Sequence, residues 1–229
     1  MLVECKNVNK NYGKVKALKN INLEIPEGKI IGLLGPNGSG KTTLIKLING
    51  LLTGEGEIFI KGKSVGPESK KIVAYLPERT YLDMNMTVNE VINYFQDFYD
   101  NFDANEAYKL LEKLGINTKD KLTTMSKGTK EKVQLILVMS RKADLYILDE
   151  PIGGVDPATR DYILETILTN FQVGASIIIS THLISDVEKI LDEIIFIKNG
   201  EIYLTGSADE LRREKGKSID EIFREEFKC

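Results

Sequence analysis

The chain has 229 residues, of which 42% are hydrophobic and 28% are charged, and its formal net charge is −3 at pH 7. This composition excludes a disordered or fibrous protein, and the slight negative charge excludes a general attraction to nucleic acid or anionic lipid. Cys5 and Cys229 match no metal-ligand spacing and form no secreted disulfide framework, which favours a reducing cytoplasm. The N-terminus lacks a signal-peptide pattern, and no apolar run reaches the roughly 18 residues that cross a bilayer. We therefore expect another chain to supply any membrane contact.

Two regions of the N-terminal part alternate apolar and polar residues, residues 2–25 and 57–61. A period of two is typical of strands with one buried and one solvated face, which are usually antiparallel. In the first region the alternation is partly carried by Leu18, Ile21, Leu23 and Ile25. We predict an antiparallel β subdomain built from these two regions.

Short apolar runs without alternation recur through the rest of the chain, at residues 30–34, 73–76, 145–148, 176–180 and 194–197. Each run is rich in β-branched residues and bounded by polar residues or glycine, as expected for strands buried on both faces. Amphipathic stretches separate the runs. This order predicts an α/β fold with a largely parallel sheet.

Residues 87–142 show almost only helical periodicity. Two apolar sets recur at helical spacing, Val88, Val91, Ile92 and Phe95, and then Ala107, Leu110, Leu111 and Leu114. They predict amphipathic helices that each bury one face. Capping boxes of the form S/T-x-x-E, which mark helix starts, begin at Thr87, Ser185, Ser207 and Ser218. We predict an α-helical subdomain at about residues 79–142, inserted into the α/β core.

A glycine-rich loop follows the predicted strand at residues 30–34 and precedes an apolar helix predicted at residues 44–52. Glycines let backbone N–H groups surround phosphate oxygens at the positive end of the helix dipole, and a lysine adds charge over the outer phosphates. A structural glycine turn is the alternative. The pattern predicts a nucleoside triphosphate site made of Gly35, Pro36, Asn37, Gly38, Ser39, Gly40, Lys41, Thr42 and Thr43, with the Thr42 hydroxyl directed to Mg²⁺.

The strand predicted at residues 145–148 ends in two carboxylates, Asp149 and Glu150. Parallel sheets place ligands at this edge, and the period of two directs the pair differently. One carboxylate can hold Mg²⁺ while the other accepts a proton from an attacking water. We predict Asp149 as the metal ligand and Glu150 as the base, against the alternative of two solvated acids.

With these motifs in place, the sequence resembles the ATP-binding-cassette (ABC) family over nearly its whole length and in the family's motif order. Tyr12 matches the aromatic position that stacks on adenine. Glu78, in Tyr75-Leu76-Pro77-Glu78, occupies the family's glutamine position in the loop that leads to the helical subdomain. The resemblance implies that Glu78 contacts the nucleotide and its metal ion.

Three later segments carry the rest of the resemblance. Residues 125–129 take the place of the family signature Leu-Ser-Gly-Gly-Gln, with Lys127 and Thr129 as departures, so nucleotide contacts are implied for Ser126, Lys127 and Gly128. Residues 153–157 resemble the D-loop and place Asp156 at the nucleotide. His182, the only histidine in the chain, matches the switch histidine that contacts the γ-phosphate. A lone histidine is otherwise usually structural or solvated.

The resemblance implies one nucleotide-binding domain over residues 1–229 that hydrolyses ATP with Mg²⁺. It further implies a homodimer, or a heterodimer with another ABC ATPase subunit, bound to integral membrane permease subunits on the inner face of the cell membrane. Leu76-Pro77-Glu78, the Ser-Lys-Gly signature and the amphipathic tail at residues 218–227 look like drug, antibiotic-peptide and ABC-2 type export subunits. Residues 79–86 are expected either to contact a coupling helix of the permease or to pack on their own subdomain.

A phosphate loop is also compatible with three other functions. A translation-associated cassette ATPase normally carries two cassettes, and a chromosome-maintenance ATPase separates its phosphate motifs by long heptad repeats; neither feature is present. No nucleic-acid partner is therefore expected. A P-loop kinase or regulatory ATPase without a membrane partner remains as the alternative, although it needs neither a signature motif nor a D-loop.

Overall fold

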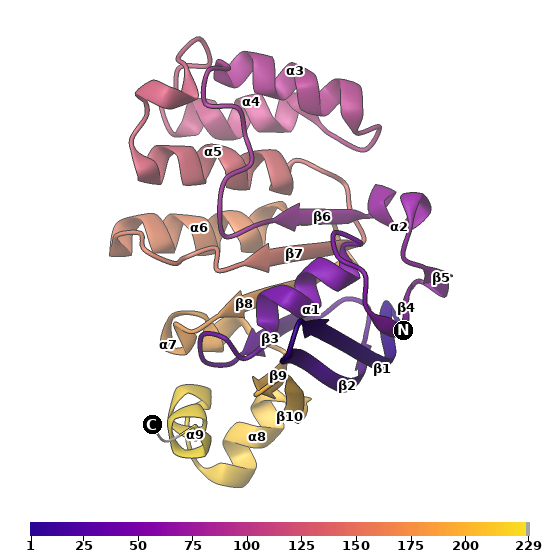
Figure 1. The fold of residues 1–229 in the computed structure, drawn as a ribbon. Helices are drawn as coiled ribbons and strands as arrows, with labels where there is room; N and C mark the ends of the chain where they lie inside the picture. Colours follow the sequence, from indigo (N-terminus) through magenta and orange to yellow (C-terminus); the bar gives the residue numbers. More distant parts are fainter. Residues whose placement is uncertain (228–229) are drawn as a thin grey trace.

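A six-stranded sheet occupies the centre of the computed structural model, which describes residues 1–227, so the predictions for Cys229 lie outside the described residues (Figure 1). The strand order is β10-β9-β3-β8-β7-β6; all neighbours pair in parallel except β10, which is antiparallel to β9. The strands are β3 (Ile30–Leu34), β6 (Val73–Leu76), β7 (Leu145–Asp149), β8 (Ser176–Thr181), β9 (Glu193–Lys198) and β10 (Glu201–Ser207). The five predicted apolar runs all fall in this sheet, and the predicted fold class is confirmed.

The strands are apolar without a break because both faces of the sheet are covered. In β7, Tyr146 and Leu148 belong to one hydrophobic cluster and Leu145 and Ile147 belong to another. Helices α5, α6, α7, α8 and α9 complete the first cluster, and α1 with the N-terminal strands completes the second. A strand enclosed in this way leaves its ends as the place where polar groups can gather.

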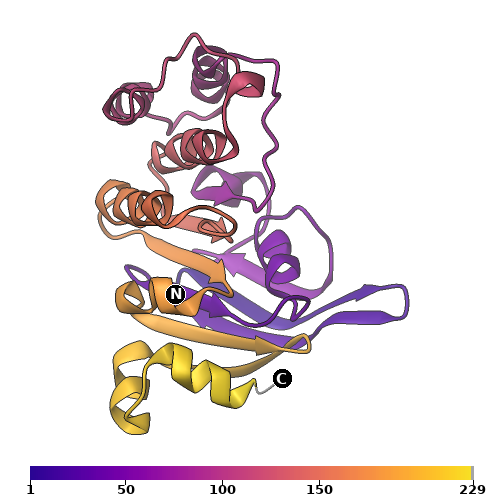
Figure 2. The ribbon, with the colours of Figure 1, turned by 90° about the vertical axis from the view of Figure 1, so that its left-hand side faces the viewer.

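The second sheet is antiparallel and has the order β2-β1-β4-β5, as the sequence predicts. Its strands are β1 (Val3–Tyr12), β2 (Val15–Ile25), β4 (Glu55–Ile60) and β5 (Lys63–Ser64). Leu18, Ile21, Leu23 and Ile25 are all buried in the cluster that this sheet shares with helix α1 (Lys41–Ile48). The hairpin end of β1 and β2 projects from the rest of the molecule (Figure 2).

The helical region lies at one end of the molecule and contains α3 (Val88–Phe98), α4 (Ala104–Lys113), the short 3₁₀ helix η1 (Leu122–Thr124) and α5 (Lys127–Met139) (Figure 1). These helices share their own hydrophobic cluster, in which Phe95 is buried. The Thr87 hydroxyl accepts from the Glu90 N–H while the Glu90 carboxylate accepts from the Thr87 N–H, so the predicted capping box is formed. The helices thus follow the predicted periodicity.

The remaining helices are α2 (Pro67–Lys71), α6 (Pro157–Asn170), α7 (Ile184–Val187), the 3₁₀ helix η2 (Glu188–Ile190), α8 (Ala208–Lys215) and α9 (Ile219–Glu226). Ser207 and Ser218 cap α8 and α9 as predicted, and Ile219 and Ile222 form the buried face of the amphipathic tail. Over residues 1–227 no helix combines the length and the apolar character needed to cross a membrane.

Two predicted helix positions are wrong. The helix predicted at residues 44–52 spans Lys41–Ile48 instead, because it starts directly after Gly40 and stops before Gly50, whose φ of +63° leaves the helical region. Ser185 is not an N-cap but lies inside α7. There the N–H of Leu183 bonds to the Thr181 hydroxyl and the helix begins with the buried Ile184, so burial determines the start.

The apolar residues of segment 79–86 mostly pack on the helical region, and the contact with a coupling helix stays a prediction. Leu82, Met84 and Met86 pack on the cluster of the helical region, which is the outcome expected of a loop packed on its own subdomain. Tyr81 is the exception, because its side chain is exposed. Any apolar contact that this segment offers to a partner therefore comes mainly from Tyr81.

Candidate functional site

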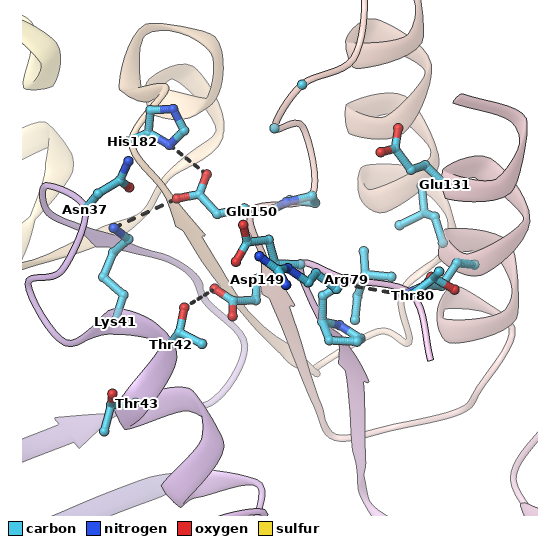
Figure 3. Close-up of a pocket in the computed structure, with 18 of the residues that line it drawn as sticks. Asn37, Lys41, Thr42, Thr43, Arg79, Thr80, Glu131, Asp149, Glu150 and His182 are labelled. Atoms are coloured by element: carbon cyan, nitrogen blue, oxygen red, sulfur yellow. Dashed lines mark hydrogen bonds and ion pairs between the residues drawn. The ribbon is translucent and has the colours of Figure 1, made fainter. Parts of the chain in front are cut away.

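A cavity of about 890 Å³ opens at the carboxyl ends of the parallel strands, where ligands of α/β sheets bind. It is bounded by the loop between β3 and α1, the loop after β6, the turn after β7, His182 after β8 and one face of α5 (Figure 3). Among the predicted residues, those that line it are Asn37, Gly38, Gly40, Lys41, Thr42, Thr43, Glu78, Lys127, Asp149, Glu150 and His182.

The loop of residues 35–40 has a backbone that only glycine tolerates at two points. Gly38 and Gly40 have φ values of +79° and +114°, in the region that side chains disfavour. A Cβ on Gly40 would also lie 2.8 Å from the Leu18 side chain and 2.9 Å from the Ala17 carbonyl oxygen. The buried hydroxyl of Ser39 has no hydrogen-bond partner. This geometry turns the loop around a space at the start of α1.

Lys41 is a buried cation at the centre of that space. Its Nζ donates to the carbonyl oxygens of Gly35 at 2.8 Å and Pro36 at 3.3 Å, and it lies 3.8 Å from Glu150 Oε1. Burial lowers the pKa of Lys41, while the carboxylates of Glu150 and Asp149 oppose that shift. The buried Lys41 ammonium has lost its hydration, and a bound anion such as a phosphate would compensate for that loss.

Asp149 is a buried carboxylate with one oxygen unused. Its Oδ1 accepts from the Thr42 hydroxyl at 3.3 Å and from the Ser180 hydroxyl, whereas its Oδ2 is buried without a partner. Burial raises the pKa of Asp149 despite the bonds from Ser180 and Thr42. An unpaired carboxylate oxygen next to a hydroxyl fits a hard divalent cation such as Mg²⁺. Over residues 1–227 no group of three or more His, Cys, Asp or Glu side chains is placed to hold a metal ion.

Glu150 leaves the strand in a different direction from Asp149. Its φ of +51° is in the left-handed region, which costs a non-glycine residue about 1 kcal/mol and is typical of functional sites. The turn brings Glu150 Oε2 to 3.2 Å from the Thr181 hydroxyl and 3.0 Å from Nδ1 of His182 (Figure 3). The Glu150 side chain is 12% exposed and that of His182 is 45% exposed. A carboxylate held between an ammonium and an imidazole is thus reachable from the cavity.

Several predicted residues lie outside the cavity lining. Tyr12 is 49% exposed near the hairpin end of β1, with the Lys10 ammonium 5.3 Å from its ring centre. Ser126 caps α5 by accepting from the Thr129 N–H, and Asp156 caps α6 by accepting from the Thr159 N–H. Gly35, Pro36, Ser39 and Gly128 likewise do not line it. A single chain therefore brings the phosphate loop, the two carboxylates and His182 together in the cavity, whereas Ser126 and Asp156, the N-caps of α5 and α6, do not line it.

The structure also adds residues that the motif analysis missed. Lys130, Glu131 and Gln134 line the cavity along one face of α5, beside the predicted Lys127, whose Nζ lies 3.6 Å from Glu131 Oε1. Gln134 also donates to the Pro77 carbonyl oxygen at 3.5 Å, next to Glu78. The sequence does contain a signal for this face, because Lys127 and the three missed residues recur at i, i+3, i+4 and i+7 in a helix whose other face is apolar.

The fold and the site place a glycine-rich loop, a buried lysine and two carboxylates at one edge of a parallel α/β sheet, an arrangement typical of proteins that bind a nucleoside triphosphate. Residues 18–153 match the family model described as ABC transporter. The chain therefore belongs to the ABC transporter family and is its ATP-binding subunit, an ATPase.

Individual relatives agree with this assignment. The chain is 34% identical to the uncharacterized ABC transporter ATP-binding protein YhaQ of Bacillus subtilis, over 92% of this chain and 73% of that protein. It is 33% identical to the linearmycin resistance ATP-binding protein LnrL of the same organism, over 92% and 70%. A solved structure of the ATP-binding subunit of an ABC transporter superposes with a TM-score of 0.88 at 31% identity, covering 98% of this chain and 99% of that one.

The burial of Asp149 predicts how stability depends on pH. Because its pKa is raised in the folded state, the ionised carboxylate destabilises the fold. That cost is absent below the unfolded pKa of about 3.9, grows as the pH rises from there to the folded pKa, and is complete above the folded pKa. We expect Asp149→Asn, in the absence of nucleotide and divalent cations, to unfold at a higher temperature than the wild type at pH 7. The difference should shrink toward pH 4 in thermal unfolding followed by circular dichroism.

Asp103→Asn provides a control of opposite sign. The hydrogen bond from the Glu106 N–H lowers the pKa of Asp103, and the contact with the Lys142 ammonium lowers it further. The ionised form of Asp103 therefore stabilises the fold above the unfolded pKa, and this stabilisation is lost in acid. This variant should unfold at a lower temperature than the wild type at pH 7. An Asp149→Asn variant that is no more stable than the wild type at pH 7 would contradict the argument.

Proposed function

We propose that this subunit hydrolyses ATP with Mg²⁺ in the cavity and thereby drives transport through a separate membrane protein. The observation that carries the proposal is the placement of Glu150, whose carboxylate lies between Lys41 and His182 in the cavity that Asp149 also lines. A general base beside a phosphate-binding cation suits phosphoryl transfer, in which positioning and charge neutralisation do most of the work.

In this proposal the triphosphate lies in the loop of residues 35–40. The N–H groups of the loop and of the first turn of α1, which contains Thr42 and Thr43, face the phosphate oxygens at the positive end of the helix dipole. The loop residues are Gly35, Pro36, Asn37, Gly38, Ser39 and Gly40. Lys41 then gives up its carbonyl contacts to Gly35 and Pro36 for the outer phosphates.

Thr42 and Asp149 are the proposed Mg²⁺ ligands, with Glu78 from the loop after β6 as a third. The hydroxyl of Thr42 and the free Oδ2 of Asp149 supply hard oxygen donors, and Glu78 lines the same cavity. A bound Mg²⁺ would neutralise charge on the phosphates. Glu78 replaces the glutamine usual in the family, so it would bring an extra negative charge to the ion.

Glu150 is the proposed base. The imidazole of His182 orients the attacking water and hydrogen-bonds the γ-phosphate. The Glu150 carboxylate takes a proton from this water as its oxygen bonds to the γ-phosphorus and the bond from the γ-phosphorus to the β-phosphate oxygen breaks, so that ADP leaves. The hydroxyl of Thr181 and the ring of His182 both approach Oε2 and hold this side chain in place. The opposite carboxylate oxygen faces Lys41, so the base lies next to the cation that binds the phosphates.

The predicted residues outside the lining are assigned to a dimer. Ser126, Lys127 and Gly128 stand at the N-terminus of α5, where N–H groups can bind an anion, and we propose that they bind the ATP of a second ABC ATPase subunit, identical or different. Asp156 would face the same junction from the start of α6. Tyr12 is exposed and free to stack on adenine. ATP would then join two subunits and its hydrolysis would release them.

The membrane partner is proposed to be an integral permease that carries an exported molecule. Support comes from the family, from the likeness to a linearmycin resistance protein and from the amphipathic α9 tail. On this view residues 1–229 form one nucleotide-binding domain with a helical subdomain at about residues 79–142, peripheral on the cytoplasmic face of the cell membrane. A soluble P-loop kinase or regulatory ATPase is the competing function, but it has no use for the segments at residues 126–129 and 153–157.

Glu150→Gln tests the base directly. The amide keeps the shape of the side chain but accepts no proton, so we expect turnover to fall by at least about a hundredfold while ATP binding persists. The variant should also accumulate as an ATP-bound dimer in size-exclusion chromatography. Phosphate release and nucleotide binding measured on the same preparation separate the two effects, and an unchanged hydrolysis rate would remove Glu150 as the base.

Lys127→Gly tests the unusual signature. Lys127 is exposed, and its Nζ lies 2.9 Å from the point where a Cβ on Gly154 would stand, so glycine opens space between α5 and residues 153–157. We expect hydrolysis that depends on subunit concentration to be preserved or raised. Lys130→Gly is the matched control on the same helix and cavity. A complete loss confined to Lys127→Gly would show that Lys127 has a role of its own.

The membrane partner is tested by purification of the tagged subunit from native membranes in mild detergent. We expect a polytopic membrane protein to copurify in fixed ratio and to raise the ATPase rate. A subunit recovered only in free form, which transfers phosphate to a small molecule instead of water, would support the kinase function and overturn this proposal.

A further inference from the structure

We propose that Arg160 is a positioning residue for hydrolysis, which ties the turn that follows Glu150 to the helix that follows His182. The inference rests on the proposed function, because it assigns a task to a residue outside the cavity. Arg160 lies in the first turn of α6 and makes contacts in two directions. Its Nε donates to the Val155 carbonyl oxygen at 3.2 Å, and its Nη1 donates to Asp186 Oδ2 at 2.7 Å.

The first contact fixes the turn between β7 and α6. At the start of this turn the Gly153 N–H donates to the Glu150 carbonyl oxygen at 3.1 Å. At its end Asp156 caps α6, and between these points the Arg160 side chain holds the carbonyl of Val155. Glu150 itself has a left-handed backbone, so its direction depends on how firmly the turn is held.

The second contact fixes the segment after β8. Asp186 belongs to α7, four positions beyond His182 in the sequence. The imidazole of His182 in turn lies 3.0 Å from the carboxylate of Glu150. The contacts therefore close a ring that runs from Glu150 through Val155, Arg160, Asp186 and His182 back to Glu150. Arg160 is the member that joins the two halves.

The partial exposure of the ion pair between Arg160 and Asp186 indicates that it positions the two segments and contributes little to the stability of the fold. The side chains of Arg160 and Asp186 are 29% and 31% exposed, and pairs of this kind contribute at most about 1 kcal/mol to folding. The rate of hydrolysis, in contrast, depends strongly on the distance between Glu150 and His182, because displacing a reacting group by about 1 Å can slow a reaction up to about a hundredfold. Loss of Arg160 should therefore affect turnover far more than stability.

The choice of arginine follows from the two contacts. A guanidinium donates through separate nitrogens to acceptors in different directions, whereas a lysine ammonium is a single point. Arg160→Lys can keep the ion pair with Asp186 or the bond to Val155, but not both in the present geometry. The conservative variant should thus behave as an intermediate between wild type and Arg160→Ala.

Arg212 offers a matched control. Its side chain is 28% exposed, it pairs with Asp209 at 2.7 Å, and it also donates to the carbonyl of Glu188. It lies in α8 and does not line the cavity. Arg212 therefore matches Arg160 in its own exposure and in contacting one carboxylate and one carbonyl oxygen, although its partner Asp209 is 80% exposed, and it makes no contact with the turn after Glu150.

The experiment measures the ATP dependence of phosphate release for the wild type, Arg160→Ala, Arg160→Lys and Arg212→Ala. We expect Arg160→Ala to lower kcat roughly tenfold with KM within about twofold, Arg160→Lys to fall between it and the wild type, and Arg212→Ala to match the wild type. An Arg160→Ala variant with wild-type kcat overturns the proposal, as does an equal loss in Arg212→Ala.

Amide hydrogen exchange supplies a readout that does not require hydrolysis. In Arg160→Ala, exchange should accelerate both at residues 150–157 and at residues 182–187, since the ring joins them. Unchanged exchange in either segment overturns the proposal. A wild-type chain that hydrolyses no ATP but whose segments loosen together in Arg160→Ala would instead refute the proposed function and leave the ring standing.

Discussion

The structure depends on one electrostatic constraint, which is the burial of Lys41 beside Asp149 and Glu150. Desolvation acts against each ionised form, lowering the pKa of Lys41 and raising that of Asp149, and the opposite charges offset part of that cost. The offset is incomplete, as the unpaired Oδ2 of Asp149 shows. A site with uncompensated charge of both signs is suited to a ligand that is itself charged in both ways, as a triphosphate with its cation is.

The two covered faces of the sheet explain why these charges meet where they do. In β7 the four side chains before Asp149 all pack into one of two apolar clusters, so Asp149 is the first position of the strand at which a charged group can lie. Strand β3 is separated from β7 by β8, and the loop after β3 leads to Lys41 at the start of α1. Groups far apart in the sequence are thus brought to one edge by strand order, and the cavity lies at that edge.

The sequence predicts those features of the structure that have a local cause, and it fails where tertiary packing decides. The bounds of β3 and β6 follow from apolar runs alone, since burial on both faces leaves a continuous signal. Ser185 shows the limit: its local pattern is a capping box, but the burial of Ile184 starts the helix earlier. Lys130, Glu131 and Gln134 were missed although their helical spacing is visible in the sequence. A polar helix face that lines a cavity and one that faces solvent have the same sequence pattern, and only the packing of the helix in the fold distinguishes them. The assignment of Tyr12 rests on motif position, and in one chain its ring lies outside the lining.

The register between β7 and β8 sets the chemistry of the edge. Asp149 pairs with Ser180, so the hydroxyl of Ser180 reaches the carboxylate of Asp149 and its carbonyl accepts from the N–H of Glu150. The next two residues, Thr181 and His182, then both reach the carboxylate of Glu150. A shift of one residue would send each of these side chains to the opposite face and separate the carboxylates from their donors. Since Ile177 and Ile179 pack on one face of the sheet and Ile178 on the other, the apolar core enforces the register, and the site inherits its geometry from hydrophobic packing.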